Sequence, residues 1–333
     1  MHKSYKILSC LNNYFIASKG YKIIQYKYEG NHPRHSGTII DRKYYWYAKS
    51  SISRRLLRAE ITKYYHFTDV NDLVIVKHGI FKKVGDNYVK CLHIPRGSKP
   101  LNLCILPNGH LFFGEYFQNI GKDAVHIYGS FNHGETWCKV FTFKAGNINH
   151  IHGLFYDKYS ERIWVLTGDR ENECIIGYTE DEFKTFTEVF RGGQEYRTCQ
   201  LFFYKDFIVF GTDTQYEQNI IKKFDRHTLE ITELQKVQGS VIKGGQVGNV
   251  AFISTTVEPS KVNTDKYAHL WVTKDGIHWE ERYKAKKDWL PATLFQFGTF
   301  EFPQYCGIEK LERLYFSGRA LKGLDGKSTY IDL

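Results

Sequence analysis

The sequence predicts an all-β protein built as a β-propeller, a ring of four-stranded antiparallel blades, with seven blades favoured and six as the alternative. Three observations carry this prediction: an aromatic-rich composition, a short phrase that recurs along the chain, and a turn motif at a second position of the repeat. Aromatic residues make up 16% of the 333 residues, and such side chains favour pleated sheets over helices.

The recurring phrase is a β-branched or aromatic run that ends in small residues. Successive copies start 59, 38, 52, 44, 43 and 64 residues apart, close to the period of roughly 40–50 residues that propeller blades show. No long amphipathic helical pattern separates the copies, which argues against alternating βα units. The copies begin at Tyr14, Leu73, Leu111, Ile163, Phe207, Val250 and Leu314.

The clearest copy of the turn motif runs from Ser130 to Trp137 and reads Ser-Phe-Asn-His-Gly-Glu-Thr-Trp. Its asparagine can cap the loop amides, its glycine can take a positive φ, and its aromatic residue can pack between blades. Eroded copies lie at residues 179–186 and 273–279. The motif predicts compact hairpin turns and carries no catalytic group.

The two ends of the chain predict how the ring closes. The last blade contains the runs 313–318 and 327–333 and is one strand short. We expect the N-terminal segment 4–8 to supply the missing outer strand, since this would leave no free sheet edge. Residues 1–333 then form a single propeller domain.

The distribution of charged and apolar residues predicts where the protein is located and which partner classes it lacks. The formal net charge is +10, but the lysine pairs are spread over separate predicted blades, so no nucleic-acid partner is expected. The longest uncharged apolar run is interrupted by Pro107, Asn108 and Gly109, so no membrane span is expected. The seven cysteines show no CxxC spacing and no signal segment is evident, which predicts reduced thiols and a cytoplasmic protein. The oligomeric state stays open.

Polar residues gather at one end of the predicted blades. In a propeller blade, the end of the second strand and the start of the innermost strand open on the same face of the ring. Candidate catalytic residues at this mouth are Glu115, Tyr116, His150, His152, Asp169 and Asp213. Candidate substrate-binding residues are Asn119, Arg197, Glu217, Glu258, Lys261 and Arg319.

These residue types suit the cleavage of an acidic sugar chain. His150 and His152 alternate on a strand, so both point to one side of the sheet, about 7 Å apart. They could act as general base and electrophile, or hold a divalent metal, although the sequence requires no cofactor. Two carboxylates could act as a glycosidase pair, or Arg197 or Arg319 could neutralise a uronate carboxylate during β-elimination. The alternative is that these charges pair with one another across blades.

Three stretches give the chain a resemblance to a known family: His150-Ile-His-Gly-Leu-Phe-Tyr-Asp, Trp164-Val-Leu-Thr-Gly-Asp and Thr255-Thr-Val-Glu-Pro-Ser-Lys-Val-Asn. With the turn motif, they resemble a little-characterised Asp-box (BNR-like) repeat family. That family is similar to sialidase-superfamily propellers and is associated with bacterial surface-polysaccharide genes. The resemblance covers most of the chain from about residue 95, and it implies a propeller fold and a role on carbohydrate.

The expected function is therefore that of a carbohydrate-active propeller that cleaves or remodels an acidic bacterial polysaccharide, as a glycoside hydrolase or a polysaccharide lyase. The alternative is a non-catalytic propeller that binds a glycan or a protein in a polysaccharide assembly pathway. Convergence of His150, a carboxylate and an arginine in one deep pocket would favour the enzyme.

Overall fold

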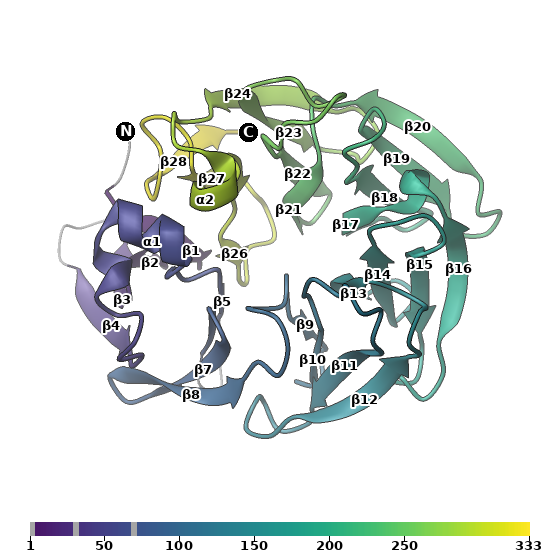
Figure 1. The fold of residues 1–333 in the computed structure, drawn as a ribbon. Helices are drawn as coiled ribbons and strands as arrows, with labels where there is room; N and C mark the ends of the chain where they lie inside the picture. The colour runs from purple at the N-terminus through teal and green to yellow at the C-terminus, as the bar shows by residue number, and fades with distance from the viewer. Residues whose placement is uncertain (1–3, 29–32, 68–71) are drawn as a thin grey trace.

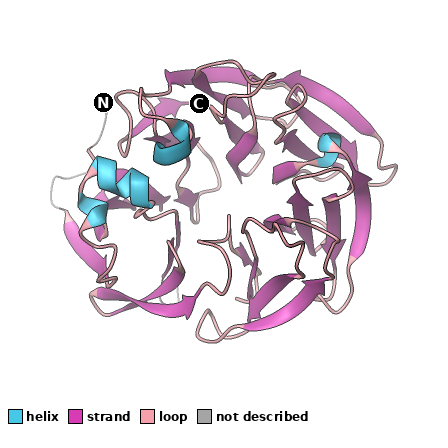
Figure 2. Cartoon of the chain, viewed as in Figure 1, coloured by secondary structure: helices cyan, strands magenta, loops and turns pink. Residues whose placement is uncertain are grey.

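The computed structural model describes residues 4–28, 33–67 and 72–333. Strands dominate these residues and form six hydrogen-bonded sheets arranged in a ring (Figures 1 and 2). Four short helical segments interrupt the strands: η1 (Tyr47–Lys49), α1 (Ser51–Leu57), η2 (Gln194–Tyr196) and α2 (Ala292–Phe295). The predicted all-β class is confirmed.

The first sheet has nine strands, which are β1 (Lys6–Cys10), β2 (Tyr14–Lys19), β3 (Lys22–Lys27), β4 (Arg34–Ile39), β5 (Lys63–Tyr65), β6 (Leu73–Val76), β7 (Gly79–Val84), β8 (Asn87–His93) and β26 (Gln304–Tyr305). It consists of two antiparallel meanders, β1–β4 and β5–β8. They are joined at their outer edges by a parallel pair, in which Thr38 lies opposite Asn87 and Ile39 lies opposite Tyr88.

Four sheets of four strands each follow along the chain. Each is an antiparallel meander in chain order. Their strands are β9 (Cys104–Ile105), β10 (Leu111–Gly114), β11 (Val125–Ser130), β12 (Cys138–Phe143), β13 (His150–Asp157), β14 (Arg162–Gly168), β15 (Cys174–Thr179), β16 (Thr187–Gly192), β17 (Thr198–Phe203), β18 (Phe207–Thr212), β19 (Ile220–Asp225), β20 (Ile231–Lys236), β21 (Val241–Val247), β22 (Val250–Thr255), β23 (Tyr267–Thr273) and β24 (Glu280–Lys286).

The last sheet has three strands, β25 (Thr299–Glu301), β27 (Arg313–Arg319) and β28 (Ser328–Asp332). Dividing the nine-stranded sheet at its β4–β8 pair gives seven consecutive groups, which is compatible with seven blades. The seven copies of the recurring phrase fall on the second strand of each group, namely β2, β6, β10, β14, β18, β22 and β27. Residues of this strand are buried on both faces, which explains their continuous apolar run.

The predicted closure by an N-terminal outer strand is wrong. Strand β1 is an inner strand, paired with β2 on one side and in parallel with β26 on the other. Strand β28 pairs with β27, at the edge of its own sheet. The reason is burial: Ile7–Cys10 are buried without alternation, whereas outer strands such as β24 expose most of their residues. The last sheet keeps three strands.

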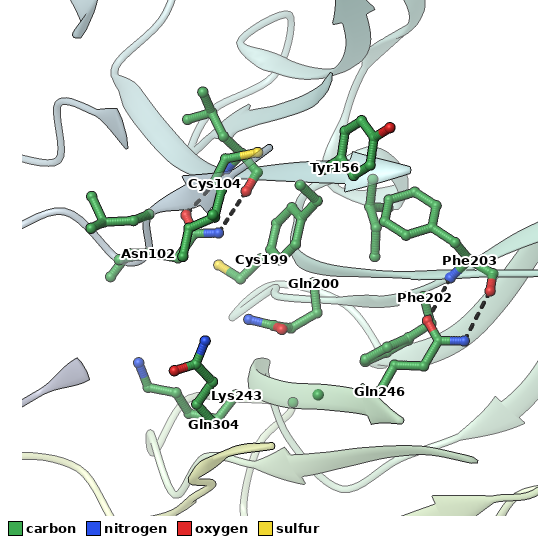
Figure 3. A pocket seen from close by; sticks show the side chains of 18 of the residues that line it. Asn102, Cys104, Tyr156, Cys199, Gln200, Phe202, Phe203, Lys243, Gln246 and Gln304 are labelled. Atoms are coloured by element: carbon green, nitrogen blue, oxygen red, sulfur yellow. Dashed lines mark hydrogen bonds between the residues drawn. The ribbon is translucent and has the colours of Figure 1, made fainter. Parts of the chain in front are cut away.

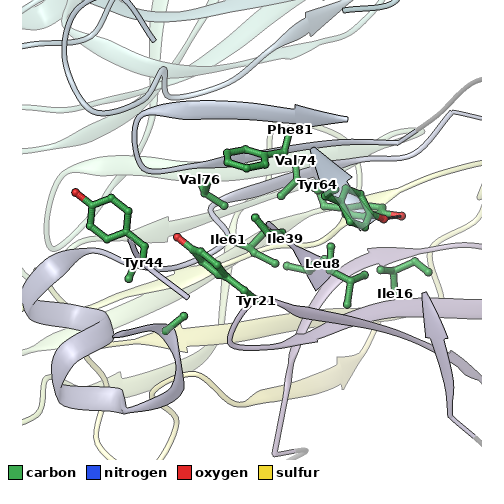
Figure 4. Packing of buried hydrophobic residues seen from close by; sticks show 14 of the residues in the cluster. Leu8, Ile16, Tyr21, Ile39, Tyr44, Ile61, Tyr64, Val74, Val76 and Phe81 are labelled. Atoms are coloured by element: carbon green, nitrogen blue, oxygen red, sulfur yellow. Dashed lines mark hydrogen bonds between the residues drawn. The ribbon is translucent and has the colours of Figure 1, made fainter. Parts of the chain in front are cut away.

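Apolar side chains of neighbouring sheets fill the space between them. Figure 4 shows such a layer between the first two meanders. Leu8 of β1 and Ile16 of β2 face it from one side, and Val74 of β6 and Phe81 of β7 face it from the other. Fully burying each large apolar side chain contributes about 1.5–3 kcal/mol, so these layers hold the sheets in place.

The predicted hairpin turns form between the third and fourth strands of three sheets. Asn132 Oδ1 accepts a hydrogen bond from the Thr136 amide at 2.9 Å, and Gly134 has a φ of 84°. Asp181 and Asp275 accept equivalent bonds from loop amides at 2.9 and 2.8 Å. The side chains thus replace the backbone partners that a tight loop lacks.

No helix within residues 4–28, 33–67 and 72–333 is long and apolar enough to cross a membrane. The thiols of Cys91, Cys104, Cys138, Cys174, Cys199 and Cys306 form no disulfide.

Candidate functional site

Local strand pairing brings two histidines and a carboxylate together. His150 and His152 lie at the start of β13, the inner strand of its sheet. His150 pairs with Gly168, the last residue of β14, so the next residue, Asp169, extends beside both rings. Arg197 lies just before β17, the inner strand of the adjacent sheet. The starts of the inner strands β13 and β17 and the end of the second strand β14 therefore present these side chains on one face of the ring.

The distances within this group are those of direct contact. His152 Nε2 lies 3.1 Å from Asp169 Oδ1, and His150 Nε2 lies 3.3 Å from Asp169 Oδ2. The two Nε2 atoms are 3.1 Å apart. Both imidazoles are buried, whereas the Asp169 side chain is 30% exposed, so the group is reached from the side of Asp169.

Backbone carbonyls orient both rings. His150 Nδ1 lies 2.9 Å from the Phe117 carbonyl oxygen, and His152 Nδ1 lies 3.0 Å from that of Thr198. A carbonyl only accepts, so each Nδ1 carries the proton and donates it. In the neutral ring, Nε2 then holds a lone pair directed at Asp169 and at the other imidazole.

Arg197 links Asp169 to a second carboxylate. Its Nη2 lies 2.9 Å from Asp169 Oδ1, and its Nε lies 3.8 Å from Asp213 Oδ2. Arg197 Nη2 and Asn149 Nδ2, each 2.9 Å from an Asp169 oxygen, donate to this carboxylate and stabilise its ionised form. Asp169 is therefore a fixed carboxylate.

Tyr116 covers the rings. Its ring centroid is 4.3 Å from that of His150, and the two planes are tilted by 54°. Burial, followed by the nearby Cys199 and Asp169, raises the pKa of Tyr116 well above its usual value, so the hydroxyl stays a neutral donor. We call Tyr116, His150, His152, Asp169, Arg197 and Asp213 the histidine cluster.

Glu258 is the carboxyl of this mouth that titrates near neutrality. It lies shortly after β22, is half-buried, and accepts a hydrogen bond from Gln215 at 2.8 Å. Burial and the negative charges of Asp213 and Asp169 raise its pKa to about 7, although Arg197 opposes the shift. A carboxyl with such a pKa can donate or accept a proton at physiological pH.

A cavity of about 550 Å³ runs along the inner strands β5, β9, β13, β17 and β21. His152, Cys199, Lys63 and Lys243 are among the residues that line it. Figure 3 shows the side chains of Cys199, Gln200, Lys243 and Gln304 pointing into the shared space. His152 of the histidine cluster thus shares this cavity with two lysines.

Lys63 and Lys243 interact electrostatically with Lys6, Lys99 and Arg319, and we call these five residues the lysine cluster. Lys63 and Lys243 are the members that line this cavity. Two of them are paired: Lys6 Nζ lies 2.7 Å from Glu301, and Arg319 Nε lies 3.2 Å from Glu60. The ammonium groups of the other three make no hydrogen bond or ion pair with any residue that the structure describes. Lys6, Lys63 and Lys243 also line a second cavity of about 230 Å³.

Burial and mutual repulsion weaken the charge of these lysines. Burial, and then the charges of Lys6 and Arg319, lower the pKa of Lys63 to about 8. The pKa of Lys99 falls to about 7 through burial and the charge of Arg319. Sequence reasoning missed Lys6, Lys63, Lys99 and Lys243, because each is a single lysine on a different part of the ring.

The other residues predicted from the sequence lie outside the histidine cluster. Glu115 is buried in an ion pair with Arg96, whose Nε is 2.9 Å from Oε1, and it also accepts the His126 amide at 2.8 Å. Asn119 caps its own loop through the Asp123 backbone. Arg319 belongs to the lysine cluster, and Glu217 and Lys261 are exposed.

Two overlapping groups in the described part of the chain have the donor types of a metal site. One consists of His150, His152 and Asp169, and the other consists of His152, Cys199 and Asp213. In the second group, the Cys199 thiol donates to Asp213 at 3.3 Å, and burial together with Asp213 raises its pKa well above 9, so the thiolate is disfavoured. The first group offers the better donors.

No family model and no curated protein matches the chain, so the resemblance to the Asp-box family is not confirmed. Solved structures match it across nearly its whole length. YCF48 bound to a D1 peptide gives a TM-score of 0.56 at 9% identity, covering 99% of this chain and 94% of that one. The WD40 β-propeller domain of Doa1 gives 0.56 at 10% identity, covering 98% and 93%. An ancestral GH74 enzyme gives 0.50 at 10% identity, covering 92% of this chain and 43% of that one. These matches establish the β-propeller fold.

Proposed function

We propose that the protein is an enzyme that cleaves an acidic glycan by β-elimination at the mouth formed by the histidine cluster. The observation that carries this proposal is the convergence of His150, His152, Asp169 and Arg197 beside a cavity that His152 lines together with Lys63 and Lys243. Catalytic sites gather titratable groups in this way, because chemistry requires perturbed charges in fixed positions.

The lysine cluster supports an acidic substrate. Lys63 and Lys243 face the cavity without a carboxylate partner among the described residues, although burying an unpaired charge is costly. A carboxylate of the substrate would satisfy both lysines and restore their ordinary pKa. Arg319, by contrast, is already occupied by Glu60 and Glu301.

Elimination fits the site better than hydrolysis. A glycosidase needs two free carboxyl groups, one as acid and one to attack the sugar or to activate water, and Glu258 could supply only one of them. Asp169 is held by two imidazoles and Arg197, and Asp213 is engaged by Arg197 and Cys199, so neither is free. Elimination needs one base, a donor for the leaving oxygen, and neutralisation of the uronate carboxylate.

We assign these roles as follows. Glu258 removes the proton on the carbon next to the uronate carboxylate, the neighbouring carbon–oxygen bond breaks, and a carbon–carbon double bond forms. Tyr116, as a neutral phenol, donates its proton to the leaving oxygen, which becomes a hydroxyl. The proton taken by Glu258 passes to water, and water returns a proton to the Tyr116 phenolate. The histidine cluster polarises the acid group, and the lysines hold the flanking charge.

The test is a product assay on uronate-containing and neutral polysaccharides. We expect new reducing ends together with the ultraviolet absorbance of an unsaturated uronate, on acidic polymers alone. Glu258→Gln should abolish both signals, while His269→Gln, a buried histidine on β23, should retain them. Reducing ends without the absorbance would replace elimination by hydrolysis, and neither signal with any acidic polymer would refute the enzyme.

A non-catalytic binding propeller is the second candidate. It is favoured by the internal ion pairs of Arg197 with Asp169 and Asp213, which already neutralise the charge that a substrate carboxylate would need. One structural neighbour, YCF48, is bound to a peptide. A binder would retain an acidic glycan or peptide in a pull-down without releasing products.

The finer assignments of fold and location are also proposals. Seven strand groups support seven blades in one domain spanning residues 1–333, and the three side-chain-capped turns support the Asp-box family. A cytoplasmic location and an acidic bacterial polysaccharide as substrate complete this proposal.

A further inference from the structure

We infer that His150, His152 and Asp169 bind a divalent transition-metal ion. This inference deepens the proposed function, and it rests on that function only for what the ion does to the substrate. The ligands would be the two imidazole Nε2 atoms and the Asp169 carboxylate, which belong to the start of β13 and the residue after β14.

The first argument is the direction of the lone pairs. Because both Nδ1 atoms donate to the carbonyls of Phe117 and Thr198, both neutral rings turn unprotonated Nε2 atoms inward. These two atoms approach to 3.1 Å, and each also lies within 3.3 Å of a carboxylate oxygen. Three acceptors facing one another repel unless a cation lies between them.

The second argument is spacing. Atom pairs 3.1 and 3.3 Å apart subtend about 95–105° at an ion held about 2.1 Å from each, the usual metal–nitrogen and metal–oxygen distance. These angles lie between octahedral and tetrahedral values. The three donors would occupy one face of the ion and leave the exposed side of Asp169 for water or a substrate oxygen.

The third argument is the outer shell. Ligating histidines usually donate their second N–H to a backbone carbonyl, and ligating carboxylates accept further hydrogen bonds. Here both histidines meet that pattern, and Asp169 accepts bonds from Asn149 Nδ2 and Arg197 Nη2, each at 2.9 Å. The supporting contacts of a metal centre are therefore present around all three donors.

The donor set indicates the class of ion. Two imidazoles and one carboxylate suit Zn²⁺, Mn²⁺, Co²⁺ or Fe²⁺ better than Ca²⁺ or Mg²⁺, which prefer oxygen alone. An ion at this position would neutralise the uronate carboxylate, a role that Arg197 is not free to take. The rival explanation is a proton shared between the two histidines.

Binding is tested on the full chain, first stripped with a chelator and dialysed. Titration with Zn²⁺ by calorimetry should show one saturable equivalent, and Co²⁺ should give visible d–d absorption. His150→Gln and Asp169→Asn should weaken Zn²⁺ binding at least about tenfold to a hundredfold, since even outer-shell changes have effects of that size. Two different variants guard against the failure of one of them to fold.

His269→Gln is the matched control. His269 is also buried and contacts Asp265 and Glu281, but each of its nitrogens faces a carboxylate, and no second imidazole faces it. This variant should bind Zn²⁺ as the wild type does. The inference is overturned if the wild type shows no saturable binding, or if His150→Gln and Asp169→Asn bind as tightly as the wild type.

The outcomes also separate the metal from the reaction. Saturable binding by a protein that cleaves no acidic polymer would refute the proposed function and leave the metal site standing. Full cleavage by the chelator-stripped protein, without Zn²⁺ binding, would refute the metal site and leave the enzyme standing.

Discussion

His152 of the histidine cluster and Lys63 and Lys243 of the lysine cluster line the same cavity, but the two clusters differ in how their charges are held. Asp169 contacts two imidazoles, Asn149 and Arg197, so its position is fixed from several sides. Lys63 and Lys243, by contrast, have no charged partner in the described part of the molecule. Fixed groups suit chemistry, which needs exact geometry, whereas unpaired cations suit the binding of an anionic polymer.

The largest expected effect comes from the histidine cluster, which we expect to be required for catalysis. We expect His150→Gln to lower kcat on the acidic glycan by about a thousandfold, in line with the loss of a positioned polar group at the reacting centre. KM should change little, because the lysine cluster remains intact. Steady-state kinetics beside His269→Gln checks this, and a raised KM with unchanged kcat would assign the cluster to binding.

Removal of the lysine charges should give the opposite pattern. In Lys63→Met/Lys243→Met, we expect KM to rise about tenfold to a hundredfold, since a hydrogen bond to a charged group contributes about 1.5–3 kcal/mol. The value of kcat should stay within a few-fold of the wild type. The salt dependence of KM should also flatten. If kcat falls instead and KM is unchanged, the lysine cluster acts in catalysis and not in substrate binding.

The pH dependence of kcat tests the role that we assign to Glu258. Its pKa is raised to about 7 by burial, Asp213 and Asp169, so the carboxylate form appears only as the pH rises through 7. As the base of an elimination, it should make kcat rise with pH, about tenfold per unit below that limb. Because the lysines titrate near 7–8, kcat and KM must be measured separately. A kcat that falls through pH 7 would make Glu258 an acid.

The smallest expected effect concerns stability. The raised pKa of Glu258 and the lowered pKa of Lys63 both show charges that folding disfavours. The charge of Lys243 is disfavoured in the same way, because burial and the neighbouring cations lower its pKa well below the usual value. We expect Lys243→Met to raise the free energy of unfolding by about 1 kcal/mol, as substitutions that relieve functional strain do. Chemical denaturation measures it, and a destabilised variant would show that the lysine is structural.

The fold could be predicted because each sheet repeats one local requirement. The second strand is buried on both faces, so its apolar run recurs whatever the loops do, as at Leu111 and Ile163. The closure could not be predicted in the same way. Segment 4–8 reads as a short apolar strand, and only its place beside β26 shows that it is an inner one.

The site was predictable where its signal was local. The alternation of His150 and His152 placed both rings on one side, but Glu115 and Asp169 could not be told apart. Each follows a glycine at the end of a second strand. Arg96, from a preceding loop, occupies Glu115 and removes it from the mouth, whereas Asp169 meets the histidines. The deciding partner comes from outside the motif.

The short parallel strand pair between β26 and β1 helps to close the ring, and its length affects how easily the ring opens. Ser9 lies opposite Gln304 and Cys10 opposite Tyr305, with one further bond from the Cys306 amide to the Cys10 carbonyl at 2.9 Å. This two-residue latch joins the late part of the chain to its beginning, whereas β13 and β14 are paired over their whole length. Breathing of the ring would therefore start at the latch, and amide exchange would be fastest there.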